Sequence, residues 1–302
     1  MCYYHCNDIE LSRATSNSYY QAAQKILAHP EAEQILLGSS RAGTTSPDYL
    51  SKKTGLKTIN LEVPGAEVFS KIALMNLALK ELKLKRVIWF ADYFEVIPSN
   101  IDEKLKSSAA LRSLTGHDLS TSKLLVGASP FITLVDHNTI AASLHTLKVR
   151  PLELANEWGG NSGEYLPCDH GSYEGKESAE SLKKKVGLLY ENYSQKILKP
   201  LPSKAAWDIF VNALKNVESR GIEVVVVIIP YHPDFILHLK SEFPQIYERH
   251  EQWAKDVVSL ASPKIKVFDY SLGIPGGDAT PKYWNDGVHF TCNGAIAMLG
   301  GL

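Results

Sequence analysis

The sequence has few cysteines and lacks a long apolar run. Its 302 residues include four cysteines, Cys2, Cys6, Cys168 and Cys292. They form no Cys-x-x-Cys pair, so neither a disulfide framework nor a zinc module is predicted. No stretch of about 18 apolar residues occurs, and the N-terminus lacks the charged-then-apolar pattern of a signal peptide. The chain as given is therefore expected to carry no membrane span and no targeting address.

The sequence also lacks an excess of either charge. Lys and Arg number 32 against 33 for Asp and Glu, which leaves a formal net charge of −1. This balance argues against a nucleic-acid partner and against a strongly basic membrane-binding face. With 44% apolar and 22% charged residues, the composition is that of an ordinary globular protein with a sizeable core.

Metal-ligating patterns are weak. Cysteine and histidine occur together in two short segments, residues 2–6 and 168–170, but neither segment has the second ligand pair of a structural metal site. The first is interpreted as a frayed terminus. No metal site is predicted.

Short apolar runs alternate with helical patterns along most of the chain. The runs that read as strands are 35–37, 58–63, 86–90, 222–229 and 264–269, and helical spacing precedes or separates them at 16–28, 46–53, 66–82, 205–220 and 233–260. Such alternation with short joins predicts a doubly wound, flavodoxin-like parallel sheet of about five strands. The run at 222–229 is the most apolar and is predicted to be central.

Residues 100–204 do not follow this alternation of strands and helices. They contain helical stretches around a polar, Gly-rich region at 156–176 and no comparably apolar strand. The segment is interpreted as a helical insertion, a candidate cap over the site, within a single domain that spans 1–302.

Two short blocks at opposite ends of the chain carry the candidate chemistry. The first apolar run leads into Gly38-Ser39-Ser40, and the second block has Asp286 three residues before His289. In open α/β sheets, ligands bind at the carboxyl ends of strands, where these serines are expected. A serine hydroxyl needs a base to accept its proton and a third group to orient that base. Taken singly, each residue has a structural explanation: a helix cap, a packed histidine, or a chance spacing.

Together, the Gly-x-Ser and Asp-x-x-His blocks resemble the first and last blocks of the SGNH (GDSL-like) hydrolases. The sequences GSSR and DGVHF are more similar to a bacterial, cell-envelope-associated branch, in which Ser replaces the Asp of the usual first block. This resemblance implies a three-layer α/β/α fold with Ser40 as the nucleophile, Asp286 as the orienting acid and His289 as the general base.

The oxyanion hole is expected to use backbone amides. The Ser40 N–H is one candidate donor, assisted by the dipole of a helix expected to follow it. On the resemblance, Gly65 in the pattern Asn60-x-x-x-x-Gly65 is the second. A glycine at a helix entry is the structural alternative for Gly65.

The third block departs from the family pattern. Most SGNH enzymes have Gly-x-Asn-Asp there, with the Asn as an oxyanion donor, whereas residues 90–94 read Phe-Ala-Asp-Tyr-Phe. An ionised Asp92 accepts hydrogen bonds only and would oppose an oxyanion. It could instead order a loop, bind a substrate hydroxyl, or donate if protonated. Loss of one oxyanion donor costs about two to three decades of rate in other enzymes.

Several other residues are candidates for contact with substrate. They are Arg41, Asn60, Asp92, Tyr93, Tyr231 and His232. Tyr231 and His232 follow the run at 222–229 and so should share the edge of the sheet with Ser40, as pocket residues or as loop packing. For Arg41, pairing with a surface carboxylate is favoured over steering an anionic or carbohydrate substrate.

These observations predict a serine-dependent esterase or acyltransferase that needs no cofactor. By resemblance, the expected substrates are small-molecule or glycan acyl esters, O-acetyl groups of cell-surface carbohydrate above all. The resemblance also suggests a cell-envelope or periplasmic location, with membrane contact only through an anchor that this chain lacks. The alternative is a catalytically weak relative that binds a glycan or an envelope partner in the same cleft. A metal-dependent phosphoesterase would need a cluster of carboxylates and histidines that the sequence does not offer.

Overall fold

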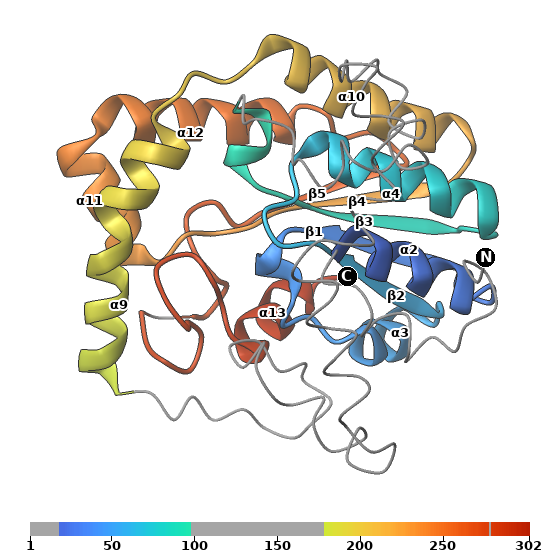
Figure 1. Cartoon of the computed structure of the whole chain (residues 1–302), viewed down its shortest axis with the longest axis horizontal. Coiled ribbons are helices and arrows are strands. Elements are labelled where there is room, and N and C mark those ends of the chain that lie inside the picture. The colour runs from blue at the N-terminus through green and yellow to red at the C-terminus, as the bar shows by residue number, and fades with distance from the viewer. Residues whose placement is uncertain (1–17, 98–177, 278) are drawn as a thin grey trace, which may run out of the picture.

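The structure is a computed structural model that describes residues 18–97, 178–277 and 279–302 (Figure 1). The described residues form a five-stranded parallel sheet with the spatial order β2-β1-β3-β4-β5. The strands are β1 Gln34–Gly38, β2 Thr58–Glu62, β3 Arg86–Ala91, β4 Glu223–Ile228 and β5 Ile265–Asp269. This order is the flavodoxin-like one and confirms the predicted doubly wound α/β class.

Helices cover both faces of the sheet and complete three layers (Figure 1). One face carries α2 Ser18–Ala28, α4 Val68–Glu81, α10 Lys204–Ser219, α11 Pro233–Glu242 and α12 Pro244–Val258. The other carries α3 Pro47–Thr54, α9 Ala179–Asn192 and α13 Cys292–Leu299. Three single-turn or irregular elements lie between these helices and the strands: η1 Ser40–Ala42, η2 Tyr93–Val96 and the π-helix η5 Tyr193–Leu198.

Alternate side chains of each strand enter two apolar cores. Leu37 and Trp89 point into the core that includes α4 and α10, whereas Leu36 and Phe90 point into the core that includes α3 and α13. The edge strands β2 and β5 include polar residues such as Asn60 and Lys266. Because both faces are covered, the inner strands β1, β3 and β4 are nearly continuous apolar runs. This explains why they stand out in the sequence.

The run at 222–229 forms β4, which lies between β3 and β5. It is an interior strand, as its apolar character requires, but the middle strand of the five is β3. The prediction of a central position is therefore wrong by one strand. All of β4 after its first residue is buried.

Two helix boundaries differ from expectation. The predicted single helical stretch from 233 to 260 is two helices, because Pro244 lacks the N–H that would continue α11. The short helix predicted at 46–53 is confirmed as α3, capped by Ser46, but only the three-residue η1 lies directly at Ser40, where a helix N-terminus was expected.

Much of the predicted insertion, residues 98–177, lies outside the described residues, as do the segments 2–6 and 168–170. The described part of the insertion is helical, as expected, and the single-domain assignment stays a prediction. Cys292, the first residue of α13, is disulfide-bonded, which no cysteine pattern in the sequence predicts.

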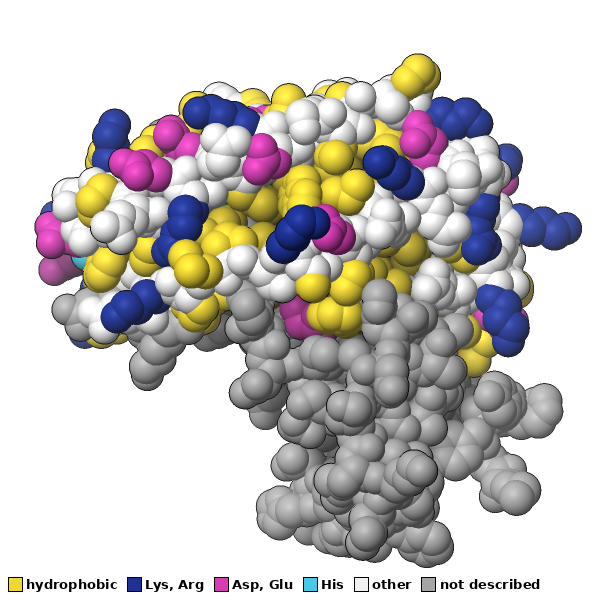
Figure 2. All heavy atoms as spheres, turned by 90° about the horizontal axis from the view of Figure 1, so that it is seen from above, with side chains coloured by type: hydrophobic (Ala, Val, Ile, Leu, Met, Phe, Trp, Pro, Cys, Tyr) yellow, Lys and Arg dark blue, Asp and Glu magenta, His cyan; other side chains and the backbone are white. Residues whose placement is uncertain are grey.

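The described surface agrees with the balanced composition. On the face shown in Figure 2, Lys and Arg side chains are interspersed with Asp and Glu around patches of apolar atoms. Among the described helices, none combines the length and the apolar character needed to cross a bilayer.

Candidate functional site

The turn after β1 forms the first part of the site, and Gly38 is required for its geometry. A Cβ atom at Gly38 would lie 2.3 Å from the Cβ of Ala42, so only glycine allows the chain to fold back this closely. Ser39 then caps η1, and its hydroxyl accepts a hydrogen bond from the Arg41 N–H at 3.4 Å. This turn places Ser40 beyond the carboxyl end of β1, as predicted.

The loop before α13 forms the second part. Asp286 Oδ1 accepts hydrogen bonds from the N–H groups of Val288, at 2.8 Å, and His289, at 2.7 Å. Its other oxygen, Oδ2, lies 2.8 Å from His289 Nδ1. An antiparallel bridge between Trp284 and Phe290 closes the loop. The Asp-x-x-His spacing therefore makes a compact turn in which one carboxylate fixes both the backbone and the imidazole.

These two parts meet. Ser40 Oγ lies 2.9 Å from His289 Nε2, although the residues are 249 positions apart in the chain. Because an ionised carboxylate only accepts hydrogen bonds, the proton at Nδ1 is assigned to the bond with Asp286. Nε2 is then the acceptor for the Ser40 hydroxyl, which is the tautomer that general-base catalysis requires.

Asp286 is held in its ionised form. Burial by itself raises the pKa of this carboxyl, but hydrogen bonds from the His289 ring and from the Val288 and His289 N–H groups lower it below its usual value. The Asp286 and His289 side chains remain 19% and 18% exposed, so the imidazole is accessible from outside.

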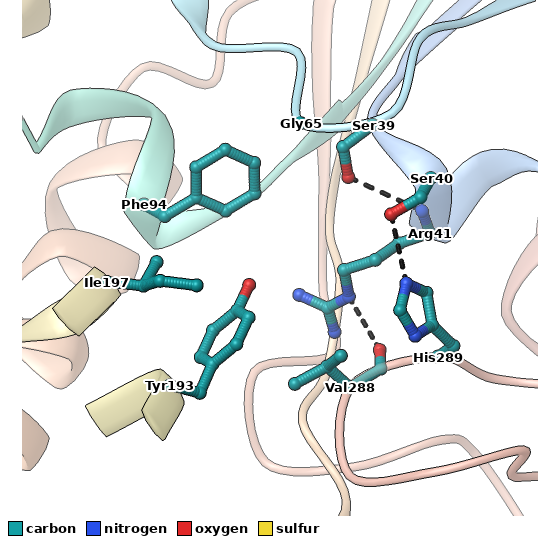
Figure 3. A pocket seen from close by; sticks show the side chains of 9 residues that line it. All are labelled: Ser39, Ser40, Arg41, Gly65, Phe94, Tyr193, Ile197, Val288 and His289. Carbon is teal, nitrogen blue, oxygen red and sulfur yellow. Dashed lines mark hydrogen bonds between the residues drawn. The ribbon is translucent and has the colours of Figure 1, made fainter. Parts of the chain in front are cut away.

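The serine opens on a cavity of about 160 Å³ (Figure 3). Its lining combines the hydroxyl and imidazole groups with a largely apolar wall: Ser39, Ser40, Arg41, Gly65, Phe94, Tyr193, Ile197, Val288 and His289. The Phe94, Tyr193 and Ile197 side chains face Ser40 and His289 across the cavity (Figure 3).

Gly65 lines this cavity with a backbone φ of +70°. This left-handed conformation favours glycine and sets the direction of the peptide groups at the rim. Among the backbone hydrogen bonds that the described residues make outside helices and strands, none is donated by the N–H of Ser40 or of Gly65. The predicted help from a helix dipole is wrong, because η1 has only three residues and cannot build a macrodipole.

Arg41 is buried and joins the ends of three other segments. Its Nε donates to the Val288 carbonyl oxygen at 2.7 Å, and its terminal nitrogens donate to the Pro230 carbonyl oxygen and to Asp92. The guanidinium carbon lies 4.6 Å from the centre of the Tyr231 ring. Burial by itself disfavours the charge, but the Asp92 carboxylate raises the pKa of Arg41 above its ordinary value.

The predictions for Arg41 are therefore corrected. Its partner is a buried carboxylate, not a surface one, and its side chain is only 1% exposed. With its nitrogens occupied, it forms part of the cavity floor and does not reach out to steer a substrate.

Asp92 has the same structural role from the other side. Its carboxylate accepts from Arg41 and, at 2.7 Å, from the Tyr231 hydroxyl. Of the expected roles, ordering a loop is the one that these contacts support. Both Asp92 and Tyr231 have buried side chains, and neither lines the cavity.

Asn60 and Tyr93 are also packing residues. The Asn60 amide nitrogen donates to the carbonyl oxygens of Ala42 and Thr45, at 2.9 and 3.0 Å, and so fastens the serine turn to β2. The Tyr93 ring is fully buried, edge-on to His250 at 5.6 Å between ring centroids. Neither residue lines the cavity beside Ser40, and substrate contact by either stays a prediction.

His232 contacts the loop that carries Asp286 and His289 but not the cavity. It caps α11, its Nδ1 accepting from the Asp234 N–H at 3.1 Å, and its ring packs edge-on against Trp284. Its backbone N–H donates to the Gly287 carbonyl oxygen at 3.0 Å. This buried histidine is therefore not a pocket residue.

Sequence reasoning missed much of the cavity wall. Phe94 follows the third strand and carries a positional signal, since strand ends in this fold line the site. Tyr193 and Ile197 lie on η5, in the stretch predicted only as helix, and no pattern in the sequence singles them out.

Among residues 18–97, 178–277 and 279–302, no group of three or more histidine, cysteine or acidic side chains is arranged to hold a metal ion. The chemistry assembled by these residues is that of a hydroxyl, an imidazole and a carboxylate.

Comparisons with known proteins add little. No protein-family model and no curated protein matches the chain. A crystal structure of a "putative acylhydrolase" from Bacteroides fragilis aligns over 94% of this chain and 92% of its own, with 13% sequence identity and a TM-score of 0.41. A likeness at that TM-score supports no conclusion about fold or activity.

Proposed function

We propose that this protein cleaves or transfers acyl groups of esters, with Ser40 as the nucleophile. The observation that carries the proposal is the continuous hydrogen-bonded series from Ser40 through His289 to Asp286, with its serine end facing a cavity. Its order and spacing are those of a serine, histidine and acid triad, which is recognised by geometry and not by position in the chain.

In the proposed reaction, Ser40 Oγ attacks the ester carbonyl carbon while its proton passes to His289 Nε2. The Asp286 carboxylate stabilises the resulting imidazolium through Nδ1. The tetrahedral intermediate then collapses, and the bond between the carbonyl carbon and the alcohol oxygen breaks. The alcohol leaves with the proton held by His289, and the acyl group remains on Ser40 as an ester. Water or a second alcohol then attacks this ester by the same steps, giving a carboxylic acid or a new ester, and Ser40 is restored.

The negative oxygen of the intermediate is assigned to the backbone N–H groups of Ser40 and Gly65. Both residues line the cavity, and such preorganised donors are worth several kcal/mol in other enzymes. The third strand supplies no further donor in this scheme, because Asp92 is the counter-ion of Arg41.

The resemblance of the two sequence blocks to SGNH hydrolases extends the proposal to that type of enzyme and to O-acetyl esters of cell-surface carbohydrate. The resemblance does not decide between water and an alcohol as the final acceptor. That choice depends on what reaches the acyl-Ser40 ester.

A second candidate function is a binding protein that uses the same cavity without turnover. The observation favouring it is the Arg41–Asp92 pair, which occupies the place where the family's third oxyanion donor is expected.

A serine-directed fluorophosphonate probe separates the two. We expect rapid labelling of the wild type, loss of labelling in Ser40→Ala, and unchanged labelling in Ser219→Ala, an exposed serine at the end of α10. Labelling that persists in Ser40→Ala, or that is absent from the folded wild type, would refute the proposal. Full ester turnover in the presence of a chelator would, in addition, exclude the phosphoesterase alternative.

A further inference from the structure

The cavity beside Ser40 has one wall that the proposed triad chemistry does not use. This wall consists of Phe94 from η2 and of Tyr193 and Ile197 from η5, with Val288 beside His289. Tyr193 and Ile197 are four residues apart, about one helical turn, and so share the side of η5 that faces the cavity (Figure 3).

The segment η5 is anchored on its opposite side. Ser194 and Leu198 are fully buried, and nearby the Ser203 N–H donates to the Val96 carbonyl oxygen at 2.6 Å, which ties the chain after η5 to the end of η2. Ile197, by contrast, is 37% exposed at the cavity. A π-helix is rare and is frequently found at functional sites. Here it presents an aromatic and an aliphatic side chain to the nucleophile.

The wall has no free charge to attract an ionic group. The Arg41 guanidinium is already bound to Val288, Pro230 and Asp92. Burial raises the pKa of Tyr193, with the Asp92 carboxylate adding to it, so the phenol stays neutral. The occupant that fits such a wall is itself neutral and mostly apolar.

The size of the cavity limits the occupant further. An apolar protein cavity of about 150 Å³ holds one benzene molecule, roughly six carbon atoms, and this cavity measures about 160 Å³. A hexose ring with its hydroxyls has about eleven non-hydrogen atoms and would also leave hydroxyls unpaired against this wall. The alcohol part of a glycan ester therefore fits the open side of the cavity better than its interior.

From these observations we infer that the cavity is an acyl-binding pocket for short, neutral, unbranched acyl groups, from acetyl to about pentanoyl, and that Ile197 sets the length limit. This inference rests on the proposed function and specifies its substrate class. Each methylene that enters the pocket should raise kcat/KM about fourfold, the value of one buried CH₂ group. The gain should stop once the chain reaches Ile197.

The test compares p-nitrophenyl esters from acetate to octanoate on the wild type, Ile197→Ala and Ile197→Trp. Leu188→Ala is the matched control, because Leu188 is an exposed leucine on α9 that does not line the cavity. We expect the optimum to move about two carbons longer in Ile197→Ala and to shrink to acetate in Ile197→Trp, with a wild-type profile in Leu188→Ala. Because Ile197 is partly exposed, we expect each variant to fold, and its thermal unfolding curve checks this.

A second series keeps acetate as the acyl group and enlarges the alcohol. If the Ile197 variants alter this series and leave the acyl-length profile unchanged, the cavity holds the alcohol and the inference is wrong. It is also wrong if neither series responds. If the wild type hydrolyses no ester in a Ser40-dependent manner, the proposed function itself fails, and the inference fails with it.

Discussion

Arg41, the residue directly after Ser40, donates a hydrogen bond from Nε to the carbonyl oxygen of Val288, the residue directly before His289, at 2.7 Å. The chain neighbours of the nucleophile and of the base are thus bonded to each other beneath the Ser40–His289 contact. Since Arg41 also pairs with Asp92 at the end of β3, the distance between alcohol and imidazole is fixed by a buried ion pair. Arg41 is in this sense a positioning residue.

Breaking this ion pair should cost both stability and activity. Asp92→Asn keeps the shape of the side chain but leaves the Arg41 charge buried without a counter-ion, which typically destabilises a protein by about 3–5 kcal/mol. We expect a fall of that size in the free energy of unfolding in urea. In the fraction that remains folded, kcat should fall with KM nearly unchanged, because the positions of the reacting groups change and the pocket does not.

The Arg86–Glu223 pair is the matched control for that experiment. It joins the first residues of β3 and β4, at the edge of the sheet away from the cavity. The Arg86 and Glu223 side chains are partly exposed, at 19% and 26%. Glu223→Gln should cost about 1 kcal/mol or less and leave kcat unchanged. Equal losses of activity in the two variants would contradict a positioning role for Arg41 and Asp92.

Asp286→Asn should impair catalysis far more than binding. The amide can still accept hydrogen bonds from the Val288 and His289 N–H groups, so the loop should keep its shape. Without the carboxylate, however, the imidazolium loses its partner and the tautomer with a proton at Nδ1 is no longer enforced. By analogy with other triads, kcat should drop by about 10⁴-fold. Steady-state kinetics measure this, and a drop of less than tenfold would remove Asp286 from the triad.

Gly65→Ala separates the oxyanion role of this residue from its backbone strain. Gly65 and Gly55 have nearly equal φ values, +70° and +71°, and in both cases an added Cβ would meet nothing within 4 Å. Alanine at either position should therefore cost a similar amount of stability, about 1–2 kcal/mol. Only Gly65→Ala should lower ester turnover, because Gly55 caps α3 at a distance from the cavity. Alanine keeps the N–H, so a loss of turnover in Gly65→Ala alone would show that the strained backbone shifts this donor; full activity in both variants would show that turnover does not need the glycine conformation at position 65.

His250 should make the protein sensitive to acid. It is 2% exposed, its Nε2 has no hydrogen-bond partner among the described residues, and burial lowers its pKa to about 4. A histidine whose pKa is lower in the folded state stabilises the fold fully above its unfolded pKa of about 6.5 and loses this contribution as the pH falls to about 4. At about 1.4 kcal/mol per pH unit, the loss is about 3 kcal/mol.

The measurement is the free energy of unfolding between pH 7 and pH 4 for the wild type and His250→Leu. Leucine keeps an apolar side chain against Tyr93 and Tyr231 but cannot take up a proton. The variant should lose about 3 kcal/mol less than the wild type over this range. Parallel curves would show that another group is responsible for the acid sensitivity.

The sheet and the three triad side chains could be predicted from the sequence because each has a local signature. The inner strands β1, β3 and β4 are nearly continuous apolar runs, and Asp286 and His289 are fixed to each other within one short turn. The serine turn carries its own glycine, Gly38, at the point of closest backbone approach. Such features depend on neighbours in the chain.

The functions of Arg41 and Asp92 could not be predicted in this way. Their partners come from different strands, so nothing close in sequence indicates that the arginine is buried or that the aspartate accepts from it. The same limit applies to Tyr193 and Ile197, whose place at the cavity follows from how η5 packs against η2. The break between α11 and α12 at Pro244, by contrast, has a local signal, because proline cannot continue a helix.

The 249 positions between Ser40 and His289 also bear on synthesis. During translation, Ser40 is made when only the first strand of the sheet exists, and His289 follows after all five strands. Until that late segment docks, nothing activates the hydroxyl. The order of translation thus keeps an unfinished chain chemically inert toward esters and makes labelling by the probe a reporter of completed folding.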